Sequence, residues 1–230
     1  MDRRYPSDAD AKRDILEAGR RLYARGLAAA NDGNISARVS HGHIWTTPSG
    51  VSKGFMTGDM LIKTDIDGNA ICGGSGKRPS SELLLHLCVY RRSADVLSVC
   101  HAHPPVASAF AAAGIPLDAA LLQEAAVLLG AIHVADYAEP GSLALAEGAA
   151  AFCPEYNGVL LEHHGAVAWG GDVMGALYTM ERIEFSATVA MYSRLMGMER
   201  PMTQRQIDAL MDLRAAWGVS GGGRPRGRDA

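Results

Sequence analysis

Short strand-like runs that alternate with helical segments constrain the fold of this chain most strongly. Two such runs near the start, residues 35–39 and 43–47, are joined by a tight Ser-His-Gly turn, and the runs at 61–63 and 70–71 flank an Asp-Gly turn. Tight turns pair neighbouring strands antiparallel, whereas strands separated by helices can pair in either sense. The pattern therefore predicts one mixed sheet that is covered by helices on both faces.

The later elements continue this alternation. Apolar residues at helical spacing, together with helix-start serines and acids, mark the helices, and short apolar runs mark the strands. The expected helices are residues 8–27, 81–92, 105–113, 121–129, 142–152, 172–196 and 203–217, with Ser80 or Ser81 capping the second, and the remaining expected strands are residues 97–100, 132–137, 159–162 and 166–169.

Length and composition bound the domain organisation. With 230 residues, of which 48% are hydrophobic and 20% are charged, the chain can bury one sizeable core, and we expect a single domain over residues 1–219. The end of the chain, residues 220–230, is rich in glycine and arginine and is predicted to be a disordered basic tail, solvated rather than bound to nucleic acid.

Charge and hydropathy argue against several classes of partner. A formal net charge of −3 gives no reason to expect nucleic acid or an acidic membrane surface, and no apolar run approaches the ~20 residues that span a bilayer. Residues 1–14 lack the apolar centre of a secretory signal. The four cysteines form no Cys-x-x-Cys pair, which argues against disulfides and against a thiolate zinc site. We therefore expect a cytoplasmic protein.

Two histidines at the end of an expected strand carry the most chemical information. In the His-Ala-His run, His101 and His103 stand at positions i and i+2, so both imidazoles point to one face and can reach one small cation. Alone, the pair is equally compatible with two ordinary strand-end histidines. The His-His-Gly turn offers a third imidazole, His164, with His163 as its structural neighbour. The histidines assigned to non-catalytic positions are His41, His43 and His133.

Three short segments have the small and hydroxyl-bearing residues that suit an anion. A helix N-terminus offers free N–H groups to a phosphate, although turn and cap chemistry would explain each segment taken singly. Taken together and beside the histidines, they predict a phosphate site. The segments are Gly33-Asn34, Ser49-Gly50 and Ser80-Ser81.

Glu82 follows the two serines, in what we expect to be the first turn of a helix. A carboxylate there gains about 0.3–1 kcal/mol from the helix dipole, which is a sufficient structural reason for its presence. It is also placed to act as a general base, or as a metal ligand that leaves when substrate arrives. A Schiff-base lysine is not expected, because no buried strand setting is evident for Lys53, Lys63 or Lys77.

Five ordered motifs together resemble the class II aldolase/adducin family, and most closely its branch of L-fuculose-phosphate aldolase-like sugar-phosphate aldolases. The resemblance covers about residues 15–197. The motifs are Gly-Asn-Ile-Ser at 33–36, Thr-Pro-Ser-Gly at 47–50, Pro-Ser-Ser-Glu at 79–82, His-Ala-His at 101–103 and His-His-Gly at 163–165.

The resemblance implies a three-layer α/β/α fold with a central mixed, largely antiparallel sheet, and a homotetramer with active sites between subunits. It implies Zn²⁺, or another divalent cation such as Mn²⁺ or Co²⁺, held by His101, His103 and His164. Glu82 would be the catalytic acid/base and would also occupy the remaining metal position. The residues that match the family's phosphate site are Gly33, Asn34, Ser49, Gly50, Ser80 and Ser81.

The activity implied is that of a lyase in carbohydrate metabolism. A ketose 1-phosphate of the fuculose, deoxyribulose or methylthioribulose type would be cleaved by a retro-aldol step, through a metal-stabilised enediolate, to dihydroxyacetone phosphate and an aldehyde. The chain departs from the fuculose-phosphate enzyme at one position, a tyrosine contributed across the subunit boundary. Residues 121–126 read Leu-Leu-Gln-Glu-Ala-Ala, so Gln123 and Glu124 are the candidates for that role, and the aldehyde is left open.

Several other activities share these features. Decarboxylase, dehydratase and epimerase members of the family use the same metal site, although the pentulose-phosphate epimerases carry aspartate where this chain has Glu82. A non-catalytic scaffold of the adducin type has no need of three ligands and a base. A metal-dependent hydrolase is disfavoured because serines beside the carboxylate suit holding a phosphate better than attacking it.

Overall fold

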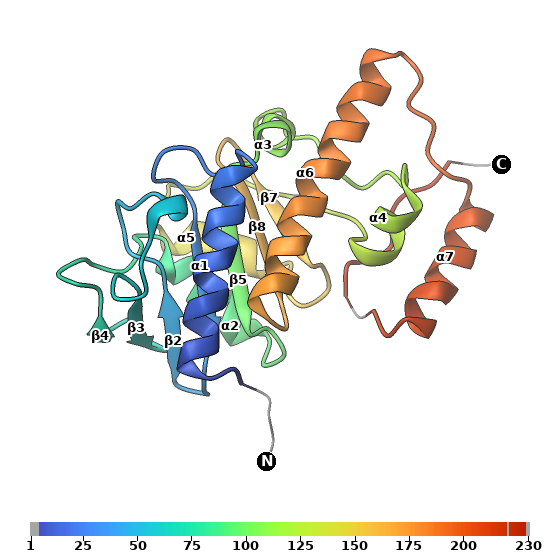
Figure 1. Cartoon of the computed structure of the whole chain (residues 1–230). Coiled ribbons are helices and arrows are strands. Elements are labelled where there is room, and N and C mark those ends of the chain that lie inside the picture. Colours follow the sequence, from blue (N-terminus) through green and yellow to red (C-terminus); the bar gives the residue numbers. More distant parts are fainter. Residues whose placement is uncertain (1–4, 220, 229–230) are drawn as a thin grey trace.

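A single eight-stranded sheet forms the centre of the computed structural model, which describes residues 5–219 and 221–228 (Figure 1). The strand order is β4-β3-β2-β1-β5-β8-β7-β6. Neighbouring strands are antiparallel except for β6 and β7, which run parallel. The strands are β1 (Asn34–Arg38), β2 (His43–Thr46), β3 (Ile62–Asp65), β4 (Ala70–Gly73), β5 (Ser98–Ala102), β6 (Val134–Ala135), β7 (Gly158–Leu161) and β8 (Gly165–Gly170).

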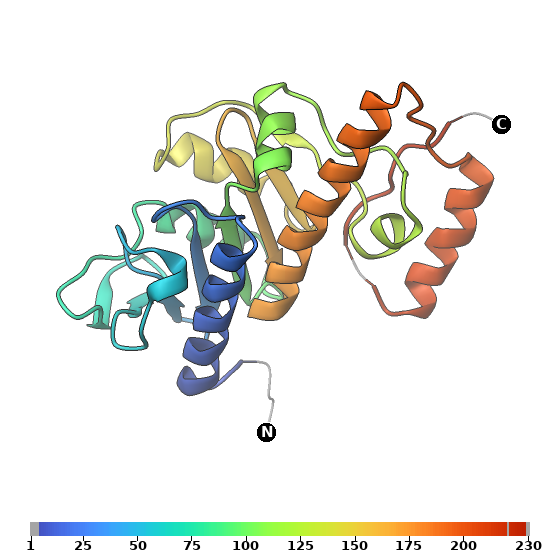
Figure 2. The same cartoon turned by 45° about the horizontal axis from the view of Figure 1, so that its top comes forward.

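Helices cover both faces of this sheet (Figures 1 and 2). Two separate clusters of buried apolar residues fill the spaces between the sheet and the two helical layers. The predicted α/β/α fold with a mixed, largely antiparallel sheet is therefore confirmed. One layer holds α1 (Asp8–Ala24), α3 (Pro105–Ala112) and α6 (Val173–Leu195), the other holds α2 (Leu83–Arg92) and α5 (Leu143–Ala150), and α4 (Gln123–Leu128) packs with α7 (Gln204–Ala216) to one side of α6.

The alternation of side chains along β5 decides which way its histidine points. Cys100 and Ala102 belong to the apolar cluster under α1 and α6, whereas Val99 packs with α2 and α5. Because successive strand residues point to opposite faces, His101 shares the α2 side with Val99. The fold thereby directs this imidazole toward the start of α2.

Helix α2 begins later than the sequence indicates. Neither Ser80 nor Ser81 is its N-cap, because Glu82 occupies that position and the helix starts at Leu83. The Ser80 N–H instead donates to the carbonyl of Thr47 at 3.3 Å, and its hydroxyl accepts the N–H of Glu82 at 3.3 Å. This pairing with the loop before residue 50 holds residues 79–81 out of the helix. Glu82 therefore lies at the boundary of α2 rather than in its first turn.

Two other elements are shorter than the sequence predicts. The expected strand at residues 132–137 is reduced to the edge strand β6, and the expected helix at 121–129 is the six-residue α4. Ile132 leaves the sheet to bridge Leu117. A run of apolar residues indicates a strand but does not indicate which segment it pairs with, so this bridge is not visible in the sequence pattern.

The end of the chain differs from the predicted disordered tail over the residues described. Residues 221–228 lie against the loop at 118–120 and against α7, where Arg226 donates to the carboxylate of Asp118 and Arg224 pairs with Asp208. Gly222 is needed for this docking, since it takes a φ of +93° and its carbonyl accepts the N–H of Ala131 at 2.7 Å. Residues 220, 229 and 230 of the predicted tail lie outside the described part.

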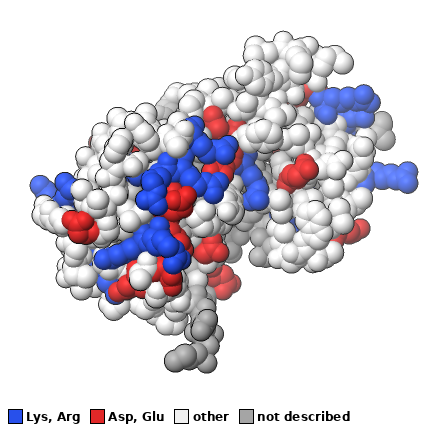
Figure 3. Space-filling model, in the orientation of Figure 1, with Lys and Arg blue, Asp and Glu red and all other residues white. Residues whose placement is uncertain are grey.

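Charges of both signs are mixed over the face that carries α1 (Figure 3). Arg21 donates to Glu181 across α1 and α6 at 2.8 Å, and Lys63 pairs with Asp8 at 2.8 Å. Mixed pairs of this kind leave no single-sign patch on this side that would attract a polyanion. Among the described helices, none is long and apolar enough to cross a bilayer.

Candidate active site

Three imidazoles converge where β5 ends and β8 begins. These strands are antiparallel neighbours with Ala102 opposite Ala166, so the end of one lies beside the start of the other. This pairing brings His101 and His103 next to His164, which precedes β8. The Nε2 atoms of His101 and His103 are 3.1 Å apart, and one ring nitrogen from each histidine lies within 4.8 Å of the others. Nitrogens about 2.1 Å from one zinc ion in tetrahedral geometry have this kind of separation.

The His-His-Gly turn explains which of its histidines points inward. His163 takes a left-handed φ of +57° and is exposed, whereas His164 turns toward the cluster. A methyl group at position 165 would lie 2.6 Å from the carbonyl oxygen of Ala102 and 2.7 Å from Cδ2 of His103. Gly165 is therefore required for the close approach of the two histidine segments.

The remaining histidines lie elsewhere. His41 contacts Tyr5 in the early hairpin, His43 contacts Ser40, and His133 packs against Phe152 and Tyr156. His86 is fully buried on α2, where its Nδ1 bonds the hydroxyl of Ser36. Among the described residues, the three convergent histidines form the one group with the geometry to hold a metal ion.

Hydrogen bonds to the far side of two rings leave the inner nitrogens available. The Nδ1–H of His101 donates to the carbonyl of Ala166 at 2.9 Å, and Nδ1 of His103 lies 3.4 Å from the carboxylate of Asp32. A carbonyl or carboxylate behind an imidazole fixes its tautomer and orients the opposite nitrogen toward a metal. His101 and His103 therefore present Nε2 to the centre of the cluster.

Glu82 completes the cluster from the side of α2. Its Oε2 lies 3.2 Å from Nε2 of His101 and its Oε1 lies 3.3 Å from Nε2 of His164. The amide of Asn34 donates to Oε2 at 3.0 Å. Because the Nδ1–H of His101 donates to Ala166, its Nε2 turns a lone pair toward a carboxylate and toward a second imidazole. The carboxylate and the imidazole nitrogens are then all electron-pair donors that face one another, which is unfavourable unless a cation lies between them. This set of ligand atoms therefore fits a divalent metal.

The protonation states suit such an ion. Burial disfavours the Glu82 carboxylate, but at the low pH where it titrates the hydrogen bond and positive charge of His101, the charge of His164 and the amide of Asn34 outweigh burial and hold the pKa of Glu82 at about 2. Burial, reinforced by the charge of His101, lowers the pKa of His164 to about 4. At neutral pH this site therefore offers an ionised carboxylate and a neutral imidazole, the forms that bind metal.

A cavity of about 140 Å³ opens beside Glu82 and His103. Ser49 is held to the neighbouring loop because its N–H donates to the carbonyl of Arg78 at 2.9 Å. Gly33 has a φ of +77°, and a methyl group there would lie 2.8 Å from the carbonyl oxygen of His101. All six residues of the expected anion site line this cavity: Gly33, Asn34, Ser49, Gly50, Ser80 and Ser81.

Two charged residues of this cavity did not stand out in the sequence. Asp32 lines it and faces His103, and its place in the same turn as Asn34 was the available signal. Lys53 also lines it and is only 2% exposed, although it lies in no strand. The sequence predicts that Lys53 is not buried in a strand. Lys53 indeed lies outside the strands, but it is buried.

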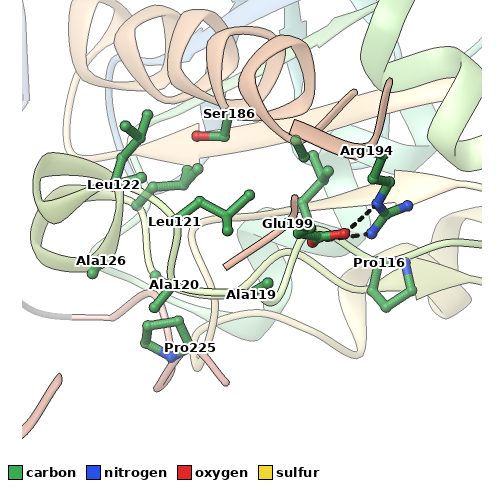
Figure 4. Close-up of a pocket in the computed structure, with 15 residues that line it drawn as sticks. Pro116, Ala119, Ala120, Leu121, Leu122, Ala126, Ser186, Arg194, Glu199 and Pro225 are labelled. Carbon is green, nitrogen blue, oxygen red and sulfur yellow. Dashed lines mark hydrogen bonds and ion pairs between the residues drawn. The ribbon is translucent and has the colours of Figure 1, made fainter. Parts of the chain in front are cut away.

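A second, much smaller cavity of about 30 Å³ lies between α6, α4 and the loop at 116–122 (Figure 4). Its walls are mainly apolar. Its polar groups are the hydroxyl of Ser186, which has no hydrogen-bond partner within the described residues, and the ion pair of Arg194 with Glu199 at 2.6 Å. It brings together no imidazoles, unlike the cavity beside Glu82.

Comparison with known proteins places most of the chain within one family. The family described as "Class II Aldolase and Adducin N-terminal domain" matches residues 13–191. A solved structure of an L-fuculose 1-phosphate aldolase superposes with a TM-score of 0.82 at 26% identity, covering 92% of this chain and 98% of the other.

Curated relatives carry out different reactions. An L-fuculose phosphate aldolase of Methanocaldococcus jannaschii is 31% identical over 80% of this chain and 97% of its own length. A 3-oxo-tetronate 4-phosphate decarboxylase of Cupriavidus necator is 31% identical over 80% and 85% of the two chains. A methylthioribulose-1-phosphate dehydratase of Gluconacetobacter diazotrophicus is 36% identical over 77% and 90%. Overall identity therefore does not choose among aldolase, decarboxylase and dehydratase.

Proposed function

The chain belongs to the class II aldolase and adducin family, and from this premise we propose that it is a metal-dependent aldolase that cleaves a ketose 1-phosphate to dihydroxyacetone phosphate and an aldehyde. The observation that carries the proposal is the approach of Glu82 to two imidazoles at 3.2 and 3.3 Å, at the edge of a cavity with anion-binding loops. A substrate whose phosphate lies among these loops has its neighbouring carbons beside Glu82 and the histidines.

His101, His103 and His164 would hold the divalent ion, which we propose to be Zn²⁺, with Mn²⁺ and Co²⁺ as alternatives. Such an ion acts as a Lewis acid that stabilises negative charge developing on substrate oxygens by several kcal/mol. Asp32 and the carbonyl of Ala166 orient two of these imidazoles. The protein contribution here is a set of ligands fixed before substrate arrives.

Glu82 would move the proton in the cleavage step. When the C3–C4 bond of the ketose breaks, the C4 hydroxyl loses its proton as C4 becomes the aldehyde carbon, and C3 becomes the hydroxymethyl carbon of dihydroxyacetone phosphate and must gain a proton. Glu82, which is ionised before the reaction, would take up the proton released from the C4 hydroxyl and deliver it to C3. In the reverse direction Glu82 removes that proton. The Asn34 amide, which donates to Oε2 at 3.0 Å, keeps the carboxylate turned toward the cavity.

Replacing Ser81 by alanine is expected to weaken binding of the phosphate group. Ser81 lines the anion cavity and is exposed to it, and a hydrogen bond to a charged group contributes about 1.5–3 kcal/mol. KM for the phosphorylated substrate should rise by ~10–100-fold, while KM for its unphosphorylated analogue stays the same. Steady-state kinetics with both compounds measures this difference, and an equal rise for both would remove Ser81 from the phosphate site.

We also propose a homotetramer in which active sites lie between subunits. Tyr178, Phe185 and Tyr192 stand seven residues apart on α6, so they lie on one side of the helix, and they are 40%, 59% and 58% exposed. An aromatic row of this kind is typical of an association surface. Gln123 and Glu124 are exposed on α4, which lies beside α7 and away from β5 (Figure 1). The active site that they would reach is therefore that of a neighbouring subunit.

The double change Phe185→Glu and Tyr192→Glu is expected to break this assembly, because it places carboxylates in a buried apolar contact. Size-exclusion chromatography with light scattering should show a tetramer for the original chain and a smaller species for the variant. Glu147→Lys, on α5 across the sheet, serves as the control and should leave the mass unchanged. A double variant with the mass of the original protein would contradict this surface.

The dehydration of methylthioribulose 1-phosphate is the second candidate reaction, favoured by the absence of a tyrosine in residues 121–126 and by the dehydratase relative. Incubating metal-loaded protein with fuculose, deoxyribulose and methylthioribulose 1-phosphates tests both. Release of dihydroxyacetone phosphate, measured by a coupled assay in which a second enzyme reduces it, supports the aldolase. Loss of water without carbon–carbon cleavage would replace the aldolase proposal with the dehydratase.

We also propose that the protein is cytoplasmic, a compartment in which its free cysteines would remain reduced.

A further inference from the structure

Lys53 is held in the wall of the anion cavity by the packing of its own segment on α1. The short 3₁₀ turn η1 (Lys53–Phe55) lies against this helix, where the Lys53 carbonyl would be 2.6 Å from a methyl group at Gly19. A methyl group at Gly54 would equally lie 2.6 Å from the ring of Tyr23. This close approach, which needs two glycines, presses the segment inward, and the Lys53 side chain is left only 2% exposed.

The buried ammonium bridges two loops of the anion cavity. Its Nζ donates to the carbonyl of Asn31 at 2.8 Å and to the carbonyl of Val51 at 2.7 Å. Asn31 precedes the Gly33-Asn34 turn, and Val51 follows the Ser49-Gly50 loop. An ammonium group has three N–H donors, and within the described residues these two carbonyls are its acceptors. One donor therefore remains for a molecule in the cavity.

The positive charge of Lys53 has no ion-pair partner in the described part of the chain. The nearest acidic influence comes from Asp32, whose carboxylate faces His103 and is 43% exposed. Burial lowers the pKa of Lys53 to about 8, and the charge of Asp32 only partly offsets it. A buried charge without a counter-charge is unfavourable, and an anion bound in the same cavity would relieve that cost.

We propose that Lys53 is a specificity-determining residue of this enzyme, which donates its third N–H to the substrate phosphate and supplies the counter-charge that selects a phosphorylated substrate. The inference rests on the proposed function, because that proposal makes this cavity the phosphate site. Lys53 has two effects there. It sets the spacing of the Asn31 and Val51 loops, and it neutralises the anion that those loops surround.

The change Lys53→Gln separates these two effects, because glutamine can still donate to a carbonyl but carries no charge. Binding of inorganic phosphate, measured by titration calorimetry on the metal-loaded protein, should weaken by ~30-fold or more, as for removal of one partner of a buried charge pair. Repeating the titration on chelated protein separates phosphate held by the cavity from phosphate held by the ion. Metal content and thermal midpoint should stay those of the original chain.

Two further variants complete the test. Lys53→Met removes both the charge and the donors, and should bind phosphate no better than Lys53→Gln. Lys77→Met removes a positive charge from an exposed position outside the cavity lining and should bind phosphate like the original chain. In turnover, Lys53→Gln should raise KM for the phosphorylated substrate and leave KM for the unphosphorylated analogue unchanged.

The pH profile gives a readout that a purely structural brace would not move. Lys53 is charged below its pKa of about 8 and loses its proton as the pH rises, so phosphate affinity should decline at alkaline pH in the original chain. The other titratable groups that line the cavity are the carboxyl groups of Asp32 and Glu82 and the imidazole of His103, whose pKa is lowered by burial, so Lys53 is the one amine among them. The alkaline decline should therefore be absent in Lys53→Gln.

The outcomes distinguish this inference from the proposed function. Phosphate affinity within twofold of the original in Lys53→Gln would overturn the role of Lys53 and leave the lyase intact. An original chain that binds no phosphate at millimolar concentration would overturn both. Tight phosphate binding that depends on Lys53, in a protein that cleaves no ketose 1-phosphate, would support Lys53 and contradict the aldolase.

Discussion

Replacing Glu82 by glutamine is expected to lower kcat for ketose 1-phosphate cleavage by about 10²–10⁴-fold, the usual contribution of a positioned general acid or base. Glutamine keeps the shape of the side chain but cannot carry the proton that C3 must gain. The carboxylate that it replaces is ionised, because its pKa is held at about 2 in the described site. Bound metal should remain near one ion per chain, since three imidazoles still hold it.

The Glu82→Gln measurement needs both kinetics and metal analysis on one preparation. Glu17→Gln, which removes a carboxylate from the exposed side of α1, controls for the loss of one negative charge and should turn over normally. A Glu82 variant that keeps full metal and near-native kcat would reject the proton-transfer role. A variant that loses its metal would instead identify Glu82 as mainly a ligand.

The geometry behind this prediction is only partly readable in the sequence. The i, i+2 spacing of His101 and His103 and the glycine after His164 are local signals, and both indicate imidazoles that point inward. Their approach to one another depends on β5 pairing with β8, which the alternation of strands and helices does not specify. The strand order is set by packing across the whole sheet.

Lys53 illustrates what local patterns do not reveal. Its segment has no strand alternation and no helical periodicity, so its burial depends on the fit of η1 against Gly19 of α1. The same limit applies to the Ser80 N–H, whose bond to Thr47 delays the start of α2. Cap and turn propensities describe neighbours in the chain, whereas these contacts join segments more than 30 residues apart.

The docking of residues 221–228 also depends on contacts with other segments of the chain. A glycine-rich, arginine-rich composition is typical of a disordered tail when it has no partner surface. Here Asp118 and Asp208 accept the arginines, and Gly222 takes the positive φ that the path requires. Both acids lie far away in the sequence or on another element, so composition alone favours the opposite prediction.

Removal of the divalent ion is expected to abolish turnover, and His101→Ala, His103→Ala and His164→Ala should each weaken metal binding by about 10²–10³-fold. The estimate follows from four-ligand zinc sites, whose total of about 10–16 kcal/mol gives about 2.5–4 kcal/mol per ligand. His101 should be the most damaging of the three. It is fully buried, its Nδ1 is fixed by the Ala166 carbonyl, and its Nε2 lies 3.1 Å from His103 and 3.2 Å from Glu82.

Chelation followed by addition of one metal at a time measures this directly, with elemental analysis before and after each step. Turnover should vanish with the ion and return when zinc, manganese or cobalt is restored. His133→Ala is the matched control, because this imidazole packs between Phe152 and Tyr156 and should leave metal affinity unchanged. A chelated protein with full activity would contradict the metal dependence. A His101→Ala variant with undiminished metal affinity would contradict the assignment of His101 as a ligand.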